Sequence, residues 1–493
     1  MTTREPDGPT YSLVVRGGRV VDPVQGLDAS LDVGVEGAAV AAVGRDLRGR
    51  TVLDAAGCVV APGFIDLHSH AQTVGGHRLQ AFDGVTTTLE LEAGAVPVAQ
   101  AYARAATEGR PINYGYSASW AAARIQTLAG HRGDGRATTM LSHFNDPAWQ
   151  REASAAEEDQ ILGLLEAELA DGSLGIGVLV GYAPATGLGE YLRVARLAAA
   201  RRVPTYTHVR DLVDFSPGVR MDGAEELVRA AAETGAHMHY CHVNSTSLRH
   251  VDRVLGLVER VRREGSTVTT EAYPYGAGST AIGAVFLSPE RLGERGLRPS
   301  DLFSVPLNRR VRDADELRHL RATDPGGLCI VHFLDEALPA DAAVMQAALS
   351  RSDMVASDAM PLTWLGAPAD DAWPLPPGAL THPRTAGTFA RSFRRLVGAG
   401  LVDLAEFVRR ASARPAAVLA AALGGPARKG TLGVGADADL VVFDPEGFRD
   451  RATYEASTQP SAGVRHLVIG GVPLIREGAL QLDARPGRPV RRG

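Results

Sequence analysis

The sequence predicts an α/β protein built on a (β/α)8 TIM barrel, with a small β-sandwich domain formed by its N- and C-terminal segments. Three observations predict this architecture: two ends rich in short strands, a middle that alternates strand-like with helical runs, and a count of eight strands in that middle. The 493 residues are 45% hydrophobic and 22% charged, which is ordinary globular usage. Barrels with insertions occupy such a length as one unit.

The two ends of the chain share one sequence pattern, which is typical of short β-strands. Short apolar runs closed by Gly, Asp or Pro fill residues 11 to 62, and similar runs return from 435 to 478. We expect residues 1–62 and 431–480 to form the two parts of one β-sandwich, and residues 481–493, which are rich in arginine, to form a solvated tail.

The middle, residues 63–430, has a strand, turn and helix rhythm that is typical of parallel βα units. Helical patterns occupy residues 96–109, 156–172, 188–202, 223–235 and 248–265. The eight candidate strands are residues 63–68, 85–92, 112–117, 173–180, 203–208, 236–242, 267–273 and 353–358. A further apolar run, 327–333, has no place in this series, and we assign it to an insertion of about 281–350, a length at which functional lids occur.

Composition argues against several classes of protein. A net charge of −6 provides no basic field for a phosphate backbone, so nucleic acid is not an expected partner. The three cysteines are too few for a disulfide framework and indicate a reducing compartment, so we expect a cytoplasmic protein. No stretch of 18 apolar residues predicts a membrane span, and a homo-oligomer remains possible.

The strongest local motif is an apolar run that ends in His68-Ser69-His70. In a strand, residues i and i+2 project to one face, so both imidazoles can point at the same place. In a barrel, the C-terminal ends of the strands are where active sites form. The alternative is that these are two ordinary polar residues in a strand-to-loop turn.

Three more predicted strands end in a side chain that can bind a metal or move a proton: His208, His242 and Asp358. Imidazole nitrogen and carboxylate oxygen are ligands that zinc prefers, and catalytic zinc keeps one position open for water. Any one of these residues alone could simply cap a loop. Together they predict a metal site at the barrel mouth.

Several segments resemble the N-acyl-D-amino-acid deacylases, the D-aminoacylase branch of the amidohydrolase superfamily. The resemblance covers essentially the whole chain in the family's order. It rests on GFIDLHSH at 63–70, THVRD at 207–211, HYCHVN at 239–244, YPYGAGST at 273–280, SDAMP at 357–361, HPRTAGTFAR at 382–391 and GTLGVGADADLVVFDP at 430–445.

The resemblance implies a metal-dependent hydrolase of carbon–nitrogen bonds other than peptide bonds. His68 and His70 would ligate one metal, and His208 and His242 a second or the principal one. The cofactor would be one or two Zn²⁺ ions, which activate a water for attack on the amide. Asp358 would act as the general base.

This chain departs from the family near the end of the second strand, where the family usually places a cysteine ligand. Ala93 falls at that point, with Glu92 beside it and Glu90 one step deeper on the same face. A carboxylate can bridge two metals, and we predict Glu92 as the substitute because it lies nearer the strand end. A carboxylated lysine is not available, since the only lysine is Lys429, close to the end of the predicted barrel segment.

For substrate, the resemblance suggests an N-acyl amino acid whose α-carboxylate is held by Arg384, helped by Tyr273 and Ser279. A guanidinium matches a carboxylate through two parallel hydrogen bonds. Arg384 could instead form a structural salt bridge, and Arg210 is a weaker candidate. Members of the family that accept acidic substrates often carry a lysine just after the sixth-strand histidine, where this chain has residues 243–245, Val-Asn-Ser.

Two other functions stay open. A cyclic amidase of the hydantoinase or dihydroorotase type would share the barrel and the metal, and a non-catalytic barrel could serve as an assembly scaffold. Near His242, we expect His239 to face the opposite side of the strand and Cys241 to point into the core.

Overall fold

Eight parallel strands form the central sheet of the computed structural model, which describes residues 9–216, 219, 221–426 and 428–493. The strands follow the order of the chain around the sheet. They are β6 (Phe64–Asp66), β7 (Val85–Ala95), β8 (Asn113–Ser119), β9 (Ile176–Val178), β10 (Thr205–Thr207), β11 (Met238–Tyr240), β12 (Val268–Ala272) and β17 (Met354–Val355). A bridge between Ser69 and Ala359 brings the first strand to the last, so the barrel is nearly closed. The predicted barrel is confirmed, with the eight strands expected.

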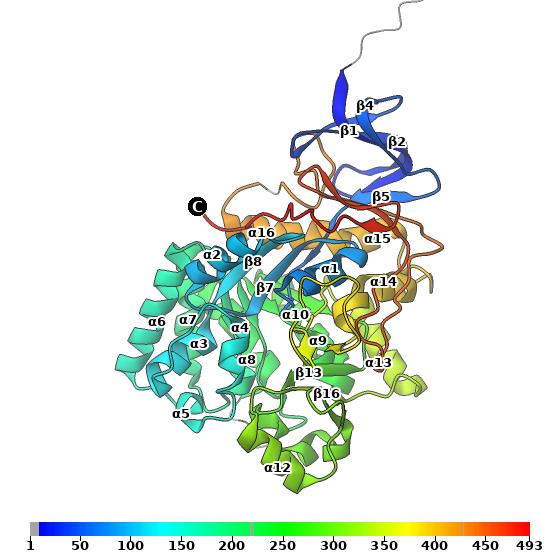
Figure 1. Cartoon of the computed structure of the whole chain (residues 1–493). Helices are drawn as coiled ribbons and strands as arrows, with labels where there is room; N and C mark the ends of the chain where they lie inside the picture. The colour runs from blue at the N-terminus through cyan, green and yellow to red at the C-terminus, as the bar shows by residue number, and fades with distance from the viewer. Residues whose placement is uncertain (1–8, 217–218, 220, 427) are drawn as a thin grey trace, which may run out of the picture.

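Helices surround this sheet (Figure 1). The principal ones are α1 (Val74–Phe82), α2 (Val98–Glu108), α6 (Ala155–Ala170), α7 (Leu188–Arg201), α8 (Gly223–Thr234), α10 (Val251–Arg263), α13 (Pro339–Arg351), α14 (Arg384–Leu396), α15 (Leu404–Val408) and α16 (Arg414–Leu423). Local signals explain their limits. Ser154 and Glu157 form a capping box that starts α6, and Gly235, with φ 70°, ends α8 in the left-handed conformation that glycine adopts without strain.

A nine-stranded sheet at one end of the barrel joins the two ends of the chain, as predicted. It contains β1 (Thr10–Asp22), β2 (Leu27–Glu36), β3 (Ala39–Gly44), β4 (Arg48–Asp54), β5 (Val59–Pro62), β20 (Leu440–Phe443), β21 (Val464–Ile469), β22 (Val472–Arg476) and β23 (Ala479–Leu480). The antiparallel pair β5 and β20 connects the N-terminal strands to the C-terminal ones.

The run 327–333 forms β16 (Leu328–His332) outside the barrel. It pairs with β13 (Ala277–Ala281) and β14 (Leu302–Ser304), and β15 (Arg309–Arg310) completes this small antiparallel sheet. Figure 1 shows this sheet, with α12 (Ala314–Thr323), at the opposite end of the barrel from the nine-stranded sheet. It therefore lies on the side toward which the barrel strands point.

The C-terminal segment is not a solvated tail, which corrects our expectation. Gly487 bridges to Arg110 and Pro489 to Tyr114, at the start of β8. Val490 is buried, and its carbonyl accepts a hydrogen bond of 2.7 Å from the Tyr102 hydroxyl. The arginine content of residues 481–493 predicted that this segment is exposed to solvent. Instead, its backbone forms hydrogen bonds with groups at the N-terminal edge of the barrel.

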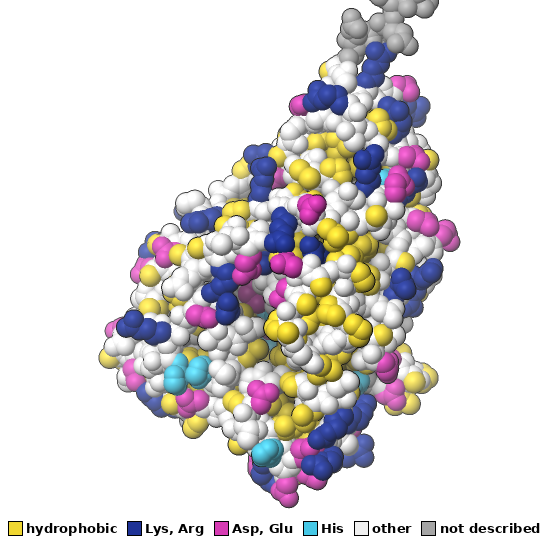
Figure 2. All heavy atoms as spheres, in the orientation of Figure 1, with side chains coloured by type: hydrophobic (Ala, Val, Ile, Leu, Met, Phe, Trp, Pro, Cys, Tyr) yellow, Lys and Arg dark blue, Asp and Glu magenta, His cyan; other side chains and the backbone are white. Residues whose placement is uncertain are grey.

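Basic and acidic side chains are interspersed on the face of the molecule shown in Figure 2, as expected from 51 basic and 57 acidic residues. Across the described ranges, no helix combines the length and the apolar character that crossing a bilayer requires.

Candidate metal centre

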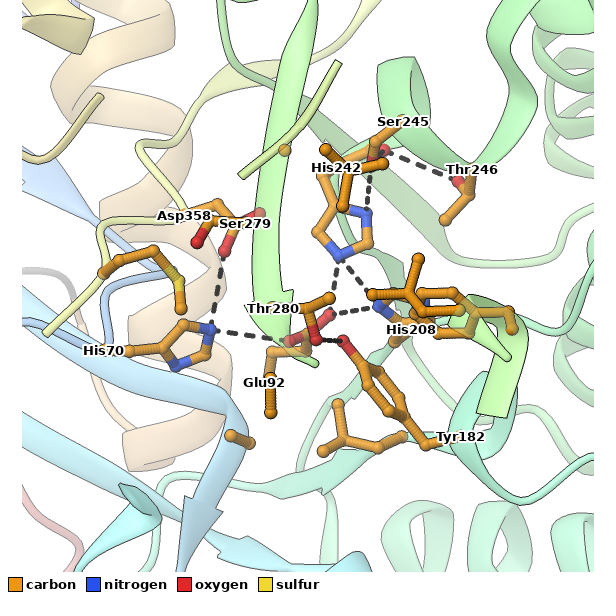
Figure 3. Close-up of a pocket in the computed structure, with 18 of the residues that line it drawn as sticks. His70, Glu92, Tyr182, His208, His242, Ser245, Thr246, Ser279, Thr280 and Asp358 are labelled. Atoms are coloured by element: carbon orange, nitrogen blue, oxygen red, sulfur yellow. Dashed lines mark hydrogen bonds and ion pairs between the residues drawn. The ribbon is translucent and has the colours of Figure 1, made fainter. Parts of the chain in front are cut away.

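Six side chains meet at the C-terminal mouth of the barrel, and all six were predicted site residues. Figure 3 labels five of them, all except His68. The six side chains come from the ends of five strands or from the loops directly after them, because parallel strands bring their carboxyl ends to one edge, and His68 and His70 both follow β6. They are His68, His70, Glu92, His208, His242 and Asp358. Asp358 and His242 adopt left-handed backbone conformations, with φ 51° and 34°. Such strained positions cluster at functional sites.

The first half of the cluster contains both histidines of the His-x-His motif. The Nε2 atoms of His68 and His70 lie 3.3 Å apart, and each is 3.4 Å from Oδ1 of Asp358. Burial opposes ionisation of Asp358, but the charge of Arg384 and the imidazoles hold its pKa below the ordinary value. Asp358 is therefore a carboxylate at neutral pH.

Glu92 joins this half of the cluster to the other. Its Oε2 lies 3.2 Å from Nε2 of His68, and its Oε1 lies 2.7 Å from Nε2 of His242 and 3.1 Å from Nδ1 of His208. Burial would raise its pKa, yet the surrounding imidazoles hold it well below the ordinary range. One carboxylate thus faces two pairs of imidazoles.

Glu90 occupies a different place from Glu92. Both of its oxygens lie 2.9 Å from Nδ1 of His70, on the side of the ring that faces away from the cluster. The register of β7 against β8 shifts between Glu90 and Ala95, and such a bulge re-aims side chains at a strand end. Of the two glutamates, Glu92 is the one that lies among the ligand atoms.

Sequence reasoning missed Glu271 and misplaced His239. Oε1 of Glu271 lies 2.5 Å from Nδ1 of His68, and its Oε2 lies 2.9 Å from Nε2 of His239. His239 therefore contacts the site's support rather than facing away, which corrects the prediction. The alternation of side chains along a strand did not predict the position of His239, because β11 ends at Tyr240 and the backbone of His242 adopts a left-handed conformation. The sequence does contain a pattern that could have identified Glu271: it is the one charged residue in the predicted strand 267–273.

Cys241 is buried within an apolar cluster, as predicted, but its thiol also lies near the site. The sulfur is within 4.8 Å of ligand atoms of His68 and Glu271. Burial raises the pKa of this thiol well above the ordinary value, so the thiol stays protonated.

Arg384 lies beside Asp358 and is fully buried. Its Nη2 is 2.9 Å from Oδ1 of Asp358, its Nε donates to the Asp358 carbonyl, and its guanidinium lies 4.7 Å from the centre of the Tyr273 ring. Arg384 therefore forms the salt bridge that was the alternative interpretation, and its role in holding a substrate carboxylate stays a prediction. Arg210 is engaged elsewhere, by Glu226 at 2.7 and 3.0 Å and by two backbone carbonyls.

Three buried polar atoms near Arg384 have no hydrogen-bond partner among the described residues: Nη1 of Arg384, the hydroxyl of Tyr273 and the hydroxyl of Ser279. A Cβ at position 278 would lie 3.1 Å from the Tyr273 hydroxyl and 3.7 Å from Nη1 of Arg384. Because Gly278 has no side chain, space remains between these two polar atoms. Burial raises the pKa of Tyr273 to about 12, which keeps its hydroxyl a donor. Buried polar atoms of this kind call for an explanation, and a ligand is one.

A pocket opens from this cluster. Tyr273, Ser279 and Asp358 line it at the cluster. Its remaining wall is largely apolar and includes Leu141, Phe144, Leu179, Phe286, Leu297 and Phe333. Ligand sites combine this kind of apolar wall with a few placed polar groups.

The donor set fits divalent metal ions. Imidazole nitrogens and carboxylate oxygens approach within 4.8 Å of one another in three overlapping groups: His68 with His70 and Glu92, His68 with His242 and Asp358, and Glu92 with His208 and His242. Buried carboxylates this close together are costly unless cations compensate them. These are ligand types that zinc and other borderline metals accept.

A (β/α)8 barrel with imidazoles and carboxylates gathered at its C-terminal mouth defines a class of metal-dependent hydrolases. The model of the amidohydrolase family matches residues 51–475, and the chain belongs to that family.

Two curated relatives come from Alcaligenes xylosoxydans xylosoxydans. The chain is 30% identical to an N-acyl-D-glutamate deacylase over 97% of its own length and 96% of that protein, and 29% identical to a D-aminoacylase over 96% of each. Among solved structures, an N-acyl-D-glutamate deacylase from Bordetella bronchiseptica matches with a TM-score of 0.75 and 24% identity, over 98% of this chain and all of that one. That structure holds zinc and a phosphonate inhibitor that mimics the tetrahedral intermediate of its reaction.

Proposed function

We propose that this protein is a metal-dependent amidohydrolase that removes the acyl group from an N-acyl-D-amino acid or a related compound with a D-residue. The observation that carries the proposal is a group of three buried polar atoms next to Asp358, one each from Arg384, Tyr273 and Ser279, that have no hydrogen-bond partner in the part of the chain that the structure describes. A substrate α-carboxylate would satisfy all three, and the guanidinium would fix its orientation. The names of the two curated relatives support the same substrate class.

The metal ligands we propose follow the two halves of the cluster. His68 and His70 would hold one ion, with Asp358 beside them as the base, His208 and His242 would hold a second, and Glu92 would be a ligand in both halves. When bound, a metal such as zinc lowers the pKa of a water toward neutrality and polarises a carbonyl.

Asp358 is the proton-transferring group in this proposal. As a carboxylate beside the first pair of histidines, it accepts a proton from the attacking water. It then delivers that proton to the amide nitrogen, which must leave as an amine. Arg384 holds Asp358 by both its carboxylate and its carbonyl, so the same side chain fixes the base and the substrate carboxylate relative to each other.

The apolar wall of the pocket excludes water from the reacting amide and would receive the acyl group or the amino-acid side chain. A linear amide with a free α-carboxylate uses both this wall and the polar atoms. A cyclic amide without a free carboxylate, such as hydantoin, leaves the carboxylate site empty.

The test is a screen of N-acetyl-D- and N-acetyl-L-amino acids, together with hydantoin and dihydroorotate, against protein loaded with Zn²⁺. We expect hydrolysis of the D-series, with the L-series and the rings at least about tenfold slower in kcat/KM, the cost of about 1.4 kcal/mol of lost contacts. Ring opening without linear cleavage would favour the cyclic amidase, and metal-loaded protein that cleaves neither would favour the scaffold.

A further inference from the structure

The residues of the proposed carboxylate site lie on one side of the metal cluster. Tyr273 follows β12 directly, and Arg384 contacts Asp358, which lies beyond the end of β17. The carbonyl of Ser279 accepts a hydrogen bond of 3.3 Å from Nη2 of Arg384, so Ser279 belongs to the same place. Because β12 and β17 are neighbours in the barrel sheet, this clamp of Arg384, Tyr273 and Ser279 occupies one sector of the barrel mouth.

A second part of the pocket lies on the opposite side of the cluster and is largely apolar. Ala93 lines it from β7, and Leu179 lines it from the position directly after β9. Between these two strands, α4 (Ala137–Leu141) lies over the end of β8. The sulfur of Met140 is 3.7 Å from the hydroxyl of Ser119, the last residue of that strand. In the order of the sheet, β8 is four strands from β12, which is half of the way around a barrel of eight.

The lining of this second part runs from the cluster to the surface. Ala93 and Phe144 are buried, and the Phe144 ring packs on the ring of Tyr182 with centroids 4.6 Å apart. On α4, Leu141 is half-buried and Thr138 is exposed, so the lining reaches solvent at Thr138. We call five of these pocket residues the far wall: Ala93, Thr138, Leu141, Phe144 and Leu179.

The shape of an amide decides which part of a substrate meets the far wall. A secondary amide is planar and trans, so the α-carbon and the acyl chain leave the C–N bond in opposite directions. With the α-carboxylate at the clamp and the carbonyl at the metal cluster, the acyl chain extends away from β12 and toward the far wall. The amino-acid side chain instead branches from the α-carbon beside the clamp, where a ring atom of Phe333 lies 3.0 Å from the place of a Cβ at position 278.

We propose that the far wall is the acyl subsite, and that this protein prefers N-acyl-D-amino acids whose acyl chain is unbranched, apolar and longer than acetyl. The methyl of an acetyl group contacts only the buried end of the far wall, whereas each further methylene exchanges water for apolar side chains. The far wall carries no charged side chain, so a dicarboxylic acyl group gains no partner there. This inference rests on the proposed function and adds the class of acyl group to it.

The experiment compares N-acetyl-, N-butanoyl- and N-hexanoyl-D-leucine on protein loaded with Zn²⁺. Burying one methylene changes affinity about fourfold, and the hexanoyl chain has four methylenes more than acetyl, the last of them near solvent. We therefore expect kcat/KM to be at least about tenfold higher for the hexanoyl compound than for the acetyl compound. Equal values, or a lower value for the hexanoyl compound, overturn the preference.

Two leucines provide a matched test of the far wall. Leu141 and Leu297 are both half-buried in the pocket lining. Leu297, however, follows the turn 293–296, in which Arg295 forms an ion pair with Asp211 of the loop after β10. Leu141→Asn should lower the hexanoyl-to-acetyl ratio of kcat/KM at least about fivefold, whereas Leu297→Asn should leave it within about twofold. A ratio that is unchanged in Leu141→Asn, or that falls equally in both variants, overturns the assignment of the far wall.

Thr138 offers a second variant in case Leu141→Asn does not fold. Because the side chain of Thr138 is exposed, Thr138→Asp should be tolerated, and its charge opposes an apolar chain at the outer end of the far wall. The ratio of kcat/KM for N-octanoyl-D-leucine to that for N-acetyl-D-leucine should fall at least about threefold. An unchanged ratio contradicts a path of the acyl chain along α4.

Binding affinity separates this inference from the proposed function. Calorimetry with the acetyl and hexanoyl compounds on metal-loaded protein measures the acyl subsite whether or not the amide is cleaved, and Asp358→Asn serves where turnover interferes. Tighter binding of the hexanoyl compound without any hydrolysis would count against the proposed function alone. Hydrolysis of N-acetyl-D-leucine, with no gain in affinity or kcat/KM from a longer chain, would count against this inference alone.

Discussion

Glu90 and Glu92 face opposite sides of one imidazole. Both oxygens of Glu90 lie 2.9 Å from Nδ1 of His70, and Oε2 of Glu92 lies 3.7 Å from Nε2 of the same ring. Two residues apart on β7, these carboxylates share a face of the strand, yet one supports a proposed ligand and the other lies among the ligands. We therefore propose that Glu92, a group with two donor atoms, takes the place of the cysteine that the family resemblance implies.

Replacing Glu92 with Gln should leave the protein with at most one tightly bound ion. The amide keeps the size of the side chain but removes the charge that faces both pairs of imidazoles. We expect kcat/KM to fall at least about 100-fold, as when an oxyanion or metal-site group of this importance is removed. Metal content by elemental analysis and activity on an N-acyl-D-amino acid measure the two effects.

Ala93 offers a matched rescue, because it lines the pocket where the family places its cysteine. In a Glu92→Gln background, Ala93→Cys should restore part of the metal binding, since a thiolate is a strong zinc ligand. Binding that stays at the level of Glu92→Gln would show that the bulge in β7 holds position 93 out of reach.

Asp358→Asn should separate metal binding from turnover. The two histidine pairs and Glu92 remain, so metal content should stay close to that of the unaltered protein, whereas kcat should fall about 10²- to 10⁴-fold because the proton carrier is lost. Steady-state kinetics at saturating metal checks this. Turnover equal to that of the unaltered protein would refute the role of Asp358 as base.

The sequence predicted the barrel and the six clustered side chains because both depend on the regular geometry of parallel strands. Parallel strands end at one edge, and His68 and His70 keep the alternation of a strand. The supporting residues depend on irregular geometry: His239 and Glu271 meet His68 only because β11 ends at Tyr240, before the alternation could carry His239 away. The position of the C-terminal segment was also not predictable from composition, because backbone contacts hold Val490 against the barrel, such as the hydrogen bond that its carbonyl accepts from Tyr102.

Arg384→Met should impair acid substrates more than their amides. The variant loses the donor for the α-carboxylate, and also the partner of Asp358, so activity falls with every substrate. A hydrogen bond to a charged group is worth about 1.5–3 kcal/mol, which predicts a further loss of about 10- to 150-fold in kcat/KM for an N-acyl-D-amino acid relative to its carboxamide. Comparing the two substrates within one variant cancels the effect on Asp358.

Tyr273→Phe is the control for this clamp. It removes one hydroxyl that has no hydrogen-bond partner among the residues described, and it leaves Asp358 in place, so the same acid-to-amide comparison should show a smaller loss in the same direction. Equal losses for acid and amide in both variants would assign Arg384 and Tyr273 to structure instead.

The pocket wall predicts a preference for apolar over acidic substrates. Leu141, Phe144, Leu179, Phe286, Leu297 and Phe333 surround the space beyond the metal cluster. Residues 243–245 after the sixth-strand histidine supply no cation for a second carboxylate. Burying a leucine-sized group is worth about 1.5–3 kcal/mol, whereas an unpaired carboxylate in the same space is penalised. N-acetyl-D-leucine should therefore exceed N-acetyl-D-glutamate in kcat/KM by at least about tenfold. Measuring kcat/KM for both substrates on one preparation tests this preference. A higher value for the glutamate derivative would require a cation that reaches its side chain. Arg295 lines the pocket, and its buried Nε has no hydrogen-bond partner among the described residues, so Arg295→Met would be the first variant to test in that case.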